Sequence, residues 1–124
     1  MAGLLADYYL DLALAAVDTD TEVLVICSAM PATYAEAFTT YKLGTKSAPT
    51  VSAPLDASPN GRKVTVSAIT DGSVSANGTA SHFALLNTTS SRLIAAQALA
   101  STQVVASGNT FTLGAIDVRI PDAV

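Results

Sequence analysis

The sequence predicts a mainly β protein, an antiparallel β-sandwich or jelly-roll-like barrel with an N-terminal α-helix packed on it. The first sign is a leucine- and alanine-rich stretch over residues 3–17, and the second is a β-branched run over residues 22–28. The third is a series of turn signals, about eight to twelve residues apart, through residues 62–121. A chain of 124 residues fits one domain. We therefore expect a single domain over 1–124, with a helix at 3–17, a strand at 22–28, a loop-rich stretch at 29–61 and a β-meander at 62–121.

The helix is predicted because leucine and alanine are strong helix formers. Its apolar arc is wide, and only Asp7 and Asp11 indicate a solvent-exposed side. We therefore expect most of the helix to be covered, either by the sheet or by neighbouring subunits. The candidate interface residues on it are Leu5, Tyr8, Tyr9 and Leu12.

The strand at 22–28 is apolar at successive positions, which is typical of a strand covered on both faces. Cys27 lies in this run, so we interpret it as a small buried hydrophobe. It is the only cysteine of the chain and has no partner for an intrachain disulfide.

Residues 29–61 contain one short helical signal. Thr33 is placed to cap a turn through residues 34–38, with Glu36 at the capping-box position. Residues 39–53 read as extended but irregular. Asn60-Gly61 is the strongest tight-turn signal in the chain.

The predicted meander has strands at 62–69, 73–77, 79–86, 92–99, 103–106 and 110–120, separated by turns that include Asp71-Gly72 and Asn77-Gly78. Residues 92–100 have helical propensity as well, but the short turns on either side favour a strand.

The last strand changes phase. Phe111 and Leu113 occupy odd positions and would point to one face of the strand. Ile116 and every second residue after it are apolar at even positions, so they would point to the other face. A β-bulge at Gly114-Ala115 would place both sets in one core. Asp117 and Arg119 share a face of this strand, so they are predicted to pair with each other or with a neighbouring chain, and they complete the candidate interface.

The sequence offers little for catalysis, metals or cofactors. Ser81 and His82 are adjacent on a strand, so their side chains are expected on opposite faces and not as a catalytic dyad. Asp18, Asp20 and Glu22 alternate as calcium ligands do, but the glycine and closing glutamate of an EF-hand loop are missing. Neither a Gly-rich phosphate loop nor a Cys/His cluster is present. The expectation is a non-enzymatic protein without a cofactor or metal.

Composition restricts the partners. Only 13% of the residues are charged, about half the usual share, and the net charge is −4. The six basic residues are scattered, which argues against a nucleic-acid partner. No run reaches the about 18 apolar residues that a membrane span needs, and the first residues lack the positive region of a signal peptide. A weakly charged surface of this kind favours contact with other subunits, so the protein is expected to act where it is made or as part of a particle.

Six stretches carry a resemblance to a known group of proteins: residues 26–37, 41–46, 60–66 with Asp71-Gly72, 78–85, 107–113 and 116–122. Together they resemble small proteins encoded in the structural-gene regions of tailed bacteriophages and prophages. The resemblance implies a virion component made in the host bacterial cytoplasm, and transfers no catalytic or binding residue.

Three roles are weighed on this basis. The first is a capsid decoration or cement protein that stabilises the shell, with itself (as a trimer) and phage capsid or tail subunits as partners. The second is a head–tail connector, tail or fibre-base component. The third is a host-surface or carbohydrate-binding module.

Overall fold

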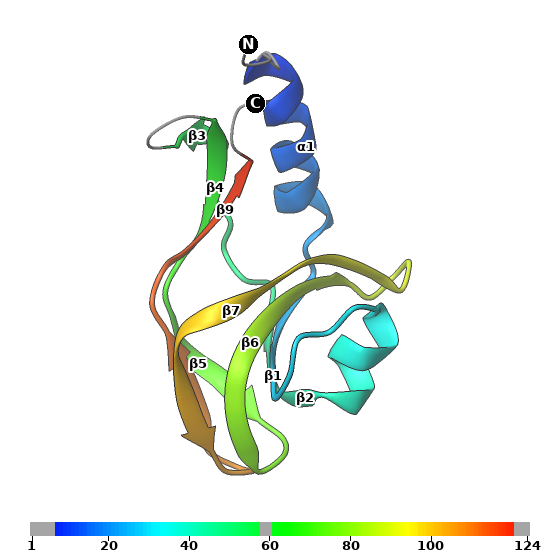
Figure 1. The fold of residues 1–124 in the computed structure, drawn as a ribbon, viewed down its shortest axis with the longest axis vertical. Helices are drawn as coiled ribbons and strands as arrows, with labels where there is room; N and C mark the ends of the chain where they lie inside the picture. Colours follow the sequence, from blue (N-terminus) through cyan, green and yellow to red (C-terminus); the bar gives the residue numbers. More distant parts are fainter. Residues whose placement is uncertain (1–6, 58–60, 121–124) are drawn as a thin grey trace.

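The computed structural model describes residues 7–57 and 61–120. It is mainly β, with an N-terminal helix and curled antiparallel sheet packed together in a sandwich-like arrangement, so the predicted fold class is confirmed (Figure 1). The elements in chain order are α1 (Asp7–Asp20), β1 (Val23–Cys27), the π-helix η1 (Glu36–Thr40), β2 (Lys42–Ser47), β3 (Leu55–Asp56), β4 (Arg62–Val66), β5 (Ile69–Val74), β6 (Gly78–Asn87), β7 (Arg92–Val105), β8 (Thr110–Leu113) and β9 (Ile116–Ile120).

The strands form two sheets. Six of them form a large sheet in the order β7-β6-β1-β2-β5-β8, and three form a small sheet in the order β3-β4-β9. The expected simple meander over 62–121 is therefore wrong. β4 and β9 leave the large sheet and pair with each other, with Val64 facing Val118 and Val66 facing Ile116. Val66 belongs to the core inside the large sheet, so the two sheets share apolar packing.

β1 is buried on both faces, as its continuous apolar run predicts. Leu24 and Ile26 point into the main core with Phe83 and Leu85. Val23, Val25 and Cys27 point the other way, into a second cluster that includes Ala37 of η1. The two-sided burial is possible because η1 covers the outer face of β1 and β2, as Figure 1 shows.

η1 forms in the stretch where a capped helical turn was predicted. Thr33 Oγ1 accepts a hydrogen bond from the Glu36 amide at 3.2 Å, and Glu36 Oε1 accepts one from the Ala32 amide at 2.8 Å. These reciprocal bonds are those of a capping box, displaced by one residue on one side. The following stretch is more regular than expected. β2 occupies 42–47 and pairs with both β1 and β5.

Cys27 is fully buried, and its Sγ lies 3.8 Å from the backbone oxygen of Ala37. Burial raises the pKa of this thiol from 9.0 to about 11. A thiol whose pKa is raised by folding is neutral in both states below pH 9, so its contribution to stability is full there. The contribution is lost as the pH rises through about 11, where the folded state must bury a thiolate.

We expect native Cys27 to resist thiol reagents at pH 8 and to react once the protein is unfolded in denaturant. Cys27→Ser is expected to lower the free energy of unfolding by about 1–3 kcal/mol, because it buries a more polar group. Cys27→Val, which keeps the site apolar, is the control. Rapid labelling of the native protein would contradict this placement.

The end of the chain changes sheet where a bulge was predicted. β8 ends at Leu113 in the large sheet, and β9 begins at Ile116 in the small sheet. The shift in apolar phase therefore marks the crossing between sheets, and the bulge prediction is wrong. Gly114 does not adopt a left-handed conformation, and a Cβ built on it would meet no atom within 4 Å. A residue with a side chain at position 114 therefore meets neither a left-handed backbone nor a steric clash.

Two more predicted turns are wrong. Asp71-Gly72 lies within β5, and residues 100–102, between two predicted strands, continue β7 as one strand with an irregular register against β6. The preference for strand over helix at 92–100 is confirmed. The N-terminal helix extends to Asp20, three residues beyond the predicted end.

Candidate functional site

Helix α1 stands beside the small sheet and lies against β4 (Figure 1). Leu10 and Leu14 are its buried residues, one helical turn apart, and Val17 packs against the main core. These positions form one stripe, as expected when a helix buries a single face. The helix therefore rests on a narrow apolar contact.

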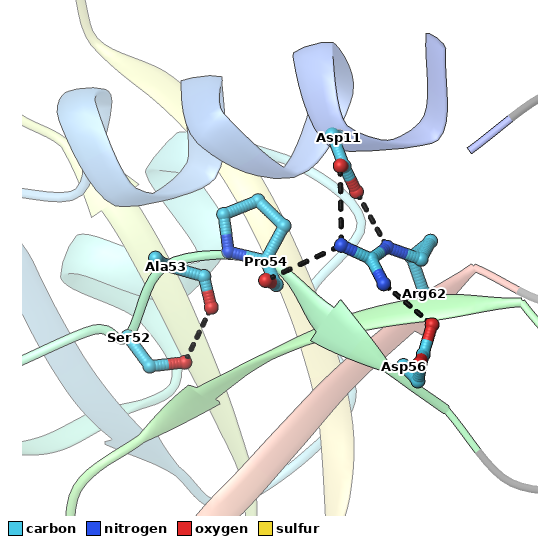
Figure 2. Close-up of polar contacts among 6 residues, drawn as sticks. All are labelled: Asp11, Ser52, Ala53, Pro54, Asp56 and Arg62. Atoms are coloured by element: carbon cyan, nitrogen blue, oxygen red, sulfur yellow. Dashed lines mark hydrogen bonds and ion pairs between the residues drawn. The ribbon is translucent and has the colours of Figure 1, made fainter. Parts of the chain in front are cut away.

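An ion-pair cluster fixes the helix on the sheet (Figure 2). Arg62 of β4 donates from Nε to Asp11 Oδ1 at 2.7 Å and from Nη2 to Asp11 Oδ2 at 3.2 Å. Its Nη1 bonds Asp56, and its Nη2 also reaches the backbone oxygen of Pro54 at 3.5 Å. Hydrogen bonds to Asp11 and then Asp56 raise the pKa of Arg62 above its usual value. A two-pronged guanidinium–carboxylate bond also restrains the orientation of the helix.

This cluster corrects one expectation. Asp11 was assigned to a wet side of the helix, but it faces the small sheet and pairs with Arg62. The two residues are 51 positions apart, so no local pattern connects them. The sequence signal available was the presence of a single charged residue between Tyr8 and Val17.

The opposite face of α1 is uncovered in the single chain. Tyr8 is 67% exposed, Tyr9 61% and Leu12 52%. The rings of Tyr8 and Tyr9 meet edge to face with their centroids 5.2 Å apart. The remaining exposed positions between them and the end of the apolar stretch are alanines: Ala13, Ala15 and Ala16. We call these six residues the α1 face. It carries no charge.

Three of the predicted interface residues thus lie together, and Asp117 and Arg119 do not join them. Leu5 is outside the described residues. Asp117 and Arg119 are exposed on β9, where they face Thr65 and Lys63 of β4. Because side chains alternate along β4, Lys63 and Thr65 lie on the face of the small sheet opposite to that of Arg62.

Asp117 is bound to the neighbouring strand. Lys63 Nζ lies 3.0 Å from Asp117 Oδ2, and Thr65 Oγ1 donates to Asp117 Oδ1 at 2.9 Å. These bonds, that of Lys63 first, lower the pKa of the Asp117 carboxyl. The pair contributes to the joining of β4 and β9, and its exposure keeps that contribution small.

Ser81 and His82 do touch, contrary to expectation. Ser81 Oγ lies 2.8 Å from His82 Nδ1 and 3.0 Å from the backbone oxygen of Ser28. The expected separation fails because the β6–β7 register is irregular between Ala80 and His82. The carbonyl of Ser28 can only accept, so the serine proton goes to it and His82 Nδ1 donates to Ser81. A base that activates a nucleophile needs the reverse arrangement.

Asp18 and Asp20 lie in the last turn of α1, and Glu22, which follows the helix, bonds the turn between β6 and β7. Glu22 accepts hydrogen bonds from the Thr89 amide at 2.8 Å and the Thr89 hydroxyl at 2.9 Å, which lower its pKa. Within residues 7–57 and 61–120, no group of three or more His, Cys, Asp or Glu side chains could hold a metal ion. No helix in the described part of the chain is long and apolar enough to cross a membrane.

Comparisons with protein-family models, with curated proteins and with solved structures found no match to this chain. The α1 face, with its tyrosine pair and its underlying ion-pair anchor, is therefore the candidate site on structural grounds alone.

Proposed function

We propose that this chain is a non-enzymatic structural subunit of a tailed-bacteriophage virion, and that it acts by packing the α1 face against a neighbouring subunit. The observation that carries the proposal is the exposure of Tyr8, Tyr9 and Leu12 on one uncharged face of a helix. Large amphipathic side chains of this kind are enriched where proteins bind each other.

The anchoring of α1 supports this use. A binding face is most effective when it is held rigid before the partner arrives, because less conformational freedom is lost on binding. Leu10 and Leu14 pack beneath the helix, and Arg62 clamps Asp11 from the sheet. The α1 face is therefore presented by a fixed element.

The chemistry of the face favours a protein partner over a sugar. Carbohydrate sites combine an aromatic platform with polar groups that bond the hydroxyls. Apart from the tyrosine hydroxyls, the α1 face offers leucine and alanine side chains. The resemblance to structural-region phage proteins then names a virion subunit as the neighbour. We propose capsid decoration or cement, in many copies and as a trimer, with a connector or tail position as the alternative.

Leu12→Asp tests the proposal, and Leu55→Asp is its matched control. The two leucines are 52% and 48% exposed, and Leu55 lies on β3, away from the α1 face. Both variants are expected to keep the wild-type melting temperature, because surface changes alter stability by about 0.5 kcal/mol or less.

Leu12→Asp is expected to abolish oligomer formation in light scattering and incorporation into virions, whereas Leu55→Asp retains both. Because apolar burial dominates the expected contact, wild-type association should survive high salt. Quantitative mass spectrometry of purified virions distinguishes decoration, with hundreds of copies, from a connector or tail role, with a few to a few dozen. Normal incorporation of Leu12→Asp, or absence of the wild-type protein from virions, would overturn the proposal.

A further inference from the structure

The side chains of the α1 face differ in size along the helix. Its N-terminal half carries the large side chains of Tyr8, Tyr9 and Leu12, and all three are more than half exposed. Its C-terminal half carries Ala15 and Ala16, which are exposed as well. The surface of the face therefore projects at one end and recedes at the other.

The two halves match each other about one point. Leu12 lies midway between Tyr8 and Ala16, four residues from each, and midway between the inner pair, Tyr9 and Ala15. If two copies pack antiparallel with their Leu12 residues at the axis, Tyr8 of each copy faces Ala16 of the other. Tyr9 likewise faces Ala15. Large side chains opposite small ones interdigitate and leave no void. A two-fold axis requires such a match, because every contact of one residue with another is repeated in reverse.

A parallel arrangement of the same face lacks this match. Identical residues then lie at the same level, so tyrosine rings crowd one end and alanine meets alanine at the other. Figure 1 shows that the large sheet lies at the C-terminal end of α1, whose N-terminal end points away from it. Parallel helices would bring the large sheets together at the alanine end. Antiparallel helices place them at opposite ends of the pair.

The charges of α1 favour the antiparallel direction too. Asp18 and Asp20 are exposed at its C-terminal end, and its last turn has no basic residue. In parallel helices these carboxylates would lie side by side and repel each other. In the antiparallel pair, the two Asp18 residues lie on either side of the axis and about 18 Å apart along the helix, at about 1.5 Å a residue. This exceeds the Debye length of about 8 Å at physiological ionic strength.

We propose that the partner of the α1 face is a second copy of this chain, whose α1 packs antiparallel on it across a two-fold axis at Leu12. The inference rests on the proposed function, in which the α1 face binds a neighbouring subunit, and it names that subunit and the geometry of the contact. The free chain is then a dimer. On a particle, such pairs would join copies of neighbouring trimers, each trimer being held by its contacts with the shell.

Exchange of a large and a small residue tests this register. Tyr8→Ala leaves a gap opposite Ala16, and Ala16→Tyr sets two rings against each other. Each variant is expected to raise the dissociation constant of the dimer at least about tenfold. The double variant Tyr8→Ala/Ala16→Tyr places each introduced ring opposite an introduced alanine, so the constant should return to within about threefold of wild type. Sedimentation equilibrium of the purified chains measures these constants. Circular dichroism checks that the fold is unchanged, as expected for exposed positions.

Tyr8→Ala/Ala15→Tyr is the matched control. It makes the same two kinds of change, but it sets the introduced ring against Tyr9 of the other copy. Its dimer should therefore remain at least about tenfold weaker than that of the wild type. Recovery in the first double variant and not in the second is the result expected only of an antiparallel pair centred on Leu12.

Two results would overturn the inference: a wild-type chain that stays monomeric, and a dimer that both double variants restore or neither does. Incorporation into virions tests the proposed function separately. A monomeric wild-type chain that enters virions, and fails to do so as Leu12→Asp, would refute the pair and leave the proposed function standing. A dimer with the expected recovery that is absent from virions would do the reverse.

Discussion

Replacement of Gly72 by alanine is expected to lower the melting temperature by about 10 °C or more. Gly72 faces Phe111 directly across the β5–β8 pair. A Cβ at Gly72 would lie 2.3 Å from two atoms of the Phe111 ring. The ring is buried and cannot move away without displacing its neighbours. Overpacking of a close-packed core costs about 1–3 kcal/mol and sometimes more.

Gly114→Ala is the matched control, because the same added methyl group meets open space there. Thermal denaturation followed by circular dichroism measures both variants. Phe111→Leu in the Gly72→Ala background should recover part of the loss, since the shorter side chain vacates the position of the ring. A melting temperature for Gly72→Ala within a few degrees of wild type would show that the overlap is relieved cheaply.

Gly72 also shows why local patterns mispredict part of this fold. Asp71-Gly72 has the composition of a hairpin turn, yet the glycine lies within β5. Its function there is to leave space for an aromatic ring 39 positions later in the chain. Gly44 of β2 leaves space for the Ser73 backbone oxygen, 2.6 Å from a Cβ built there, and for the Phe111 ring, 3.2 Å from it. Tertiary packing decides which side chain will lie against a glycine. A short stretch of sequence carries no information about that packing.

The strongly periodic elements were predictable for the opposite reason. The apolar run of β1 needs cover on both faces wherever it lies, and the structure supplies it from the main core and η1. The helix and the capped turn near Thr33 likewise depend on neighbouring residues alone. The strand order is different, because the crossing at Gly114-Ala115 sends β9 to another sheet. A shift in the apolar–polar alternation shows that the buried face of the strand has changed. A bulge within one strand and a crossing to another sheet produce the same shift.

The candidate site likewise has one part that local sequence predicts and one part that depends on long-range contacts. The wide apolar arc of the helix predicted Tyr8, Tyr9 and Leu12 as interface residues, and the structure places them on one exposed face. The Asp11–Arg62 anchor arises from a contact between segments 51 positions apart. Its local mark in the sequence, a single charge within an apolar stretch, does not identify the partner.

Leu14→Asp is expected to release α1 from the small sheet while the large sheet stays folded. Leu14 is buried, so the variant loses about 1.5–3 kcal/mol of apolar burial and places an unpaired carboxylate against the sheet. Together these effects are expected to cost about 3–5 kcal/mol. The main core includes Val17 of the helix at its margin but not Leu14, so its strands retain most of their contacts. The expected result is therefore local unfolding rather than global loss of structure.

Hydrogen exchange read by mass spectrometry distinguishes these cases. In Leu14→Asp, the amides of residues 10–18 should lose protection, whereas those of β1 should keep it. Leu12→Asp places the same charge two residues away on the exposed face of the same helix, so it should leave both sets protected. Both variants should fail to associate, but for different reasons: one no longer presents the α1 face, and the other presents it with a charge. Protection of α1 in Leu14→Asp equal to that in Leu12→Asp would mean that the buried stripe does not hold the helix. The Asp11–Arg62 pair would then be its principal anchor.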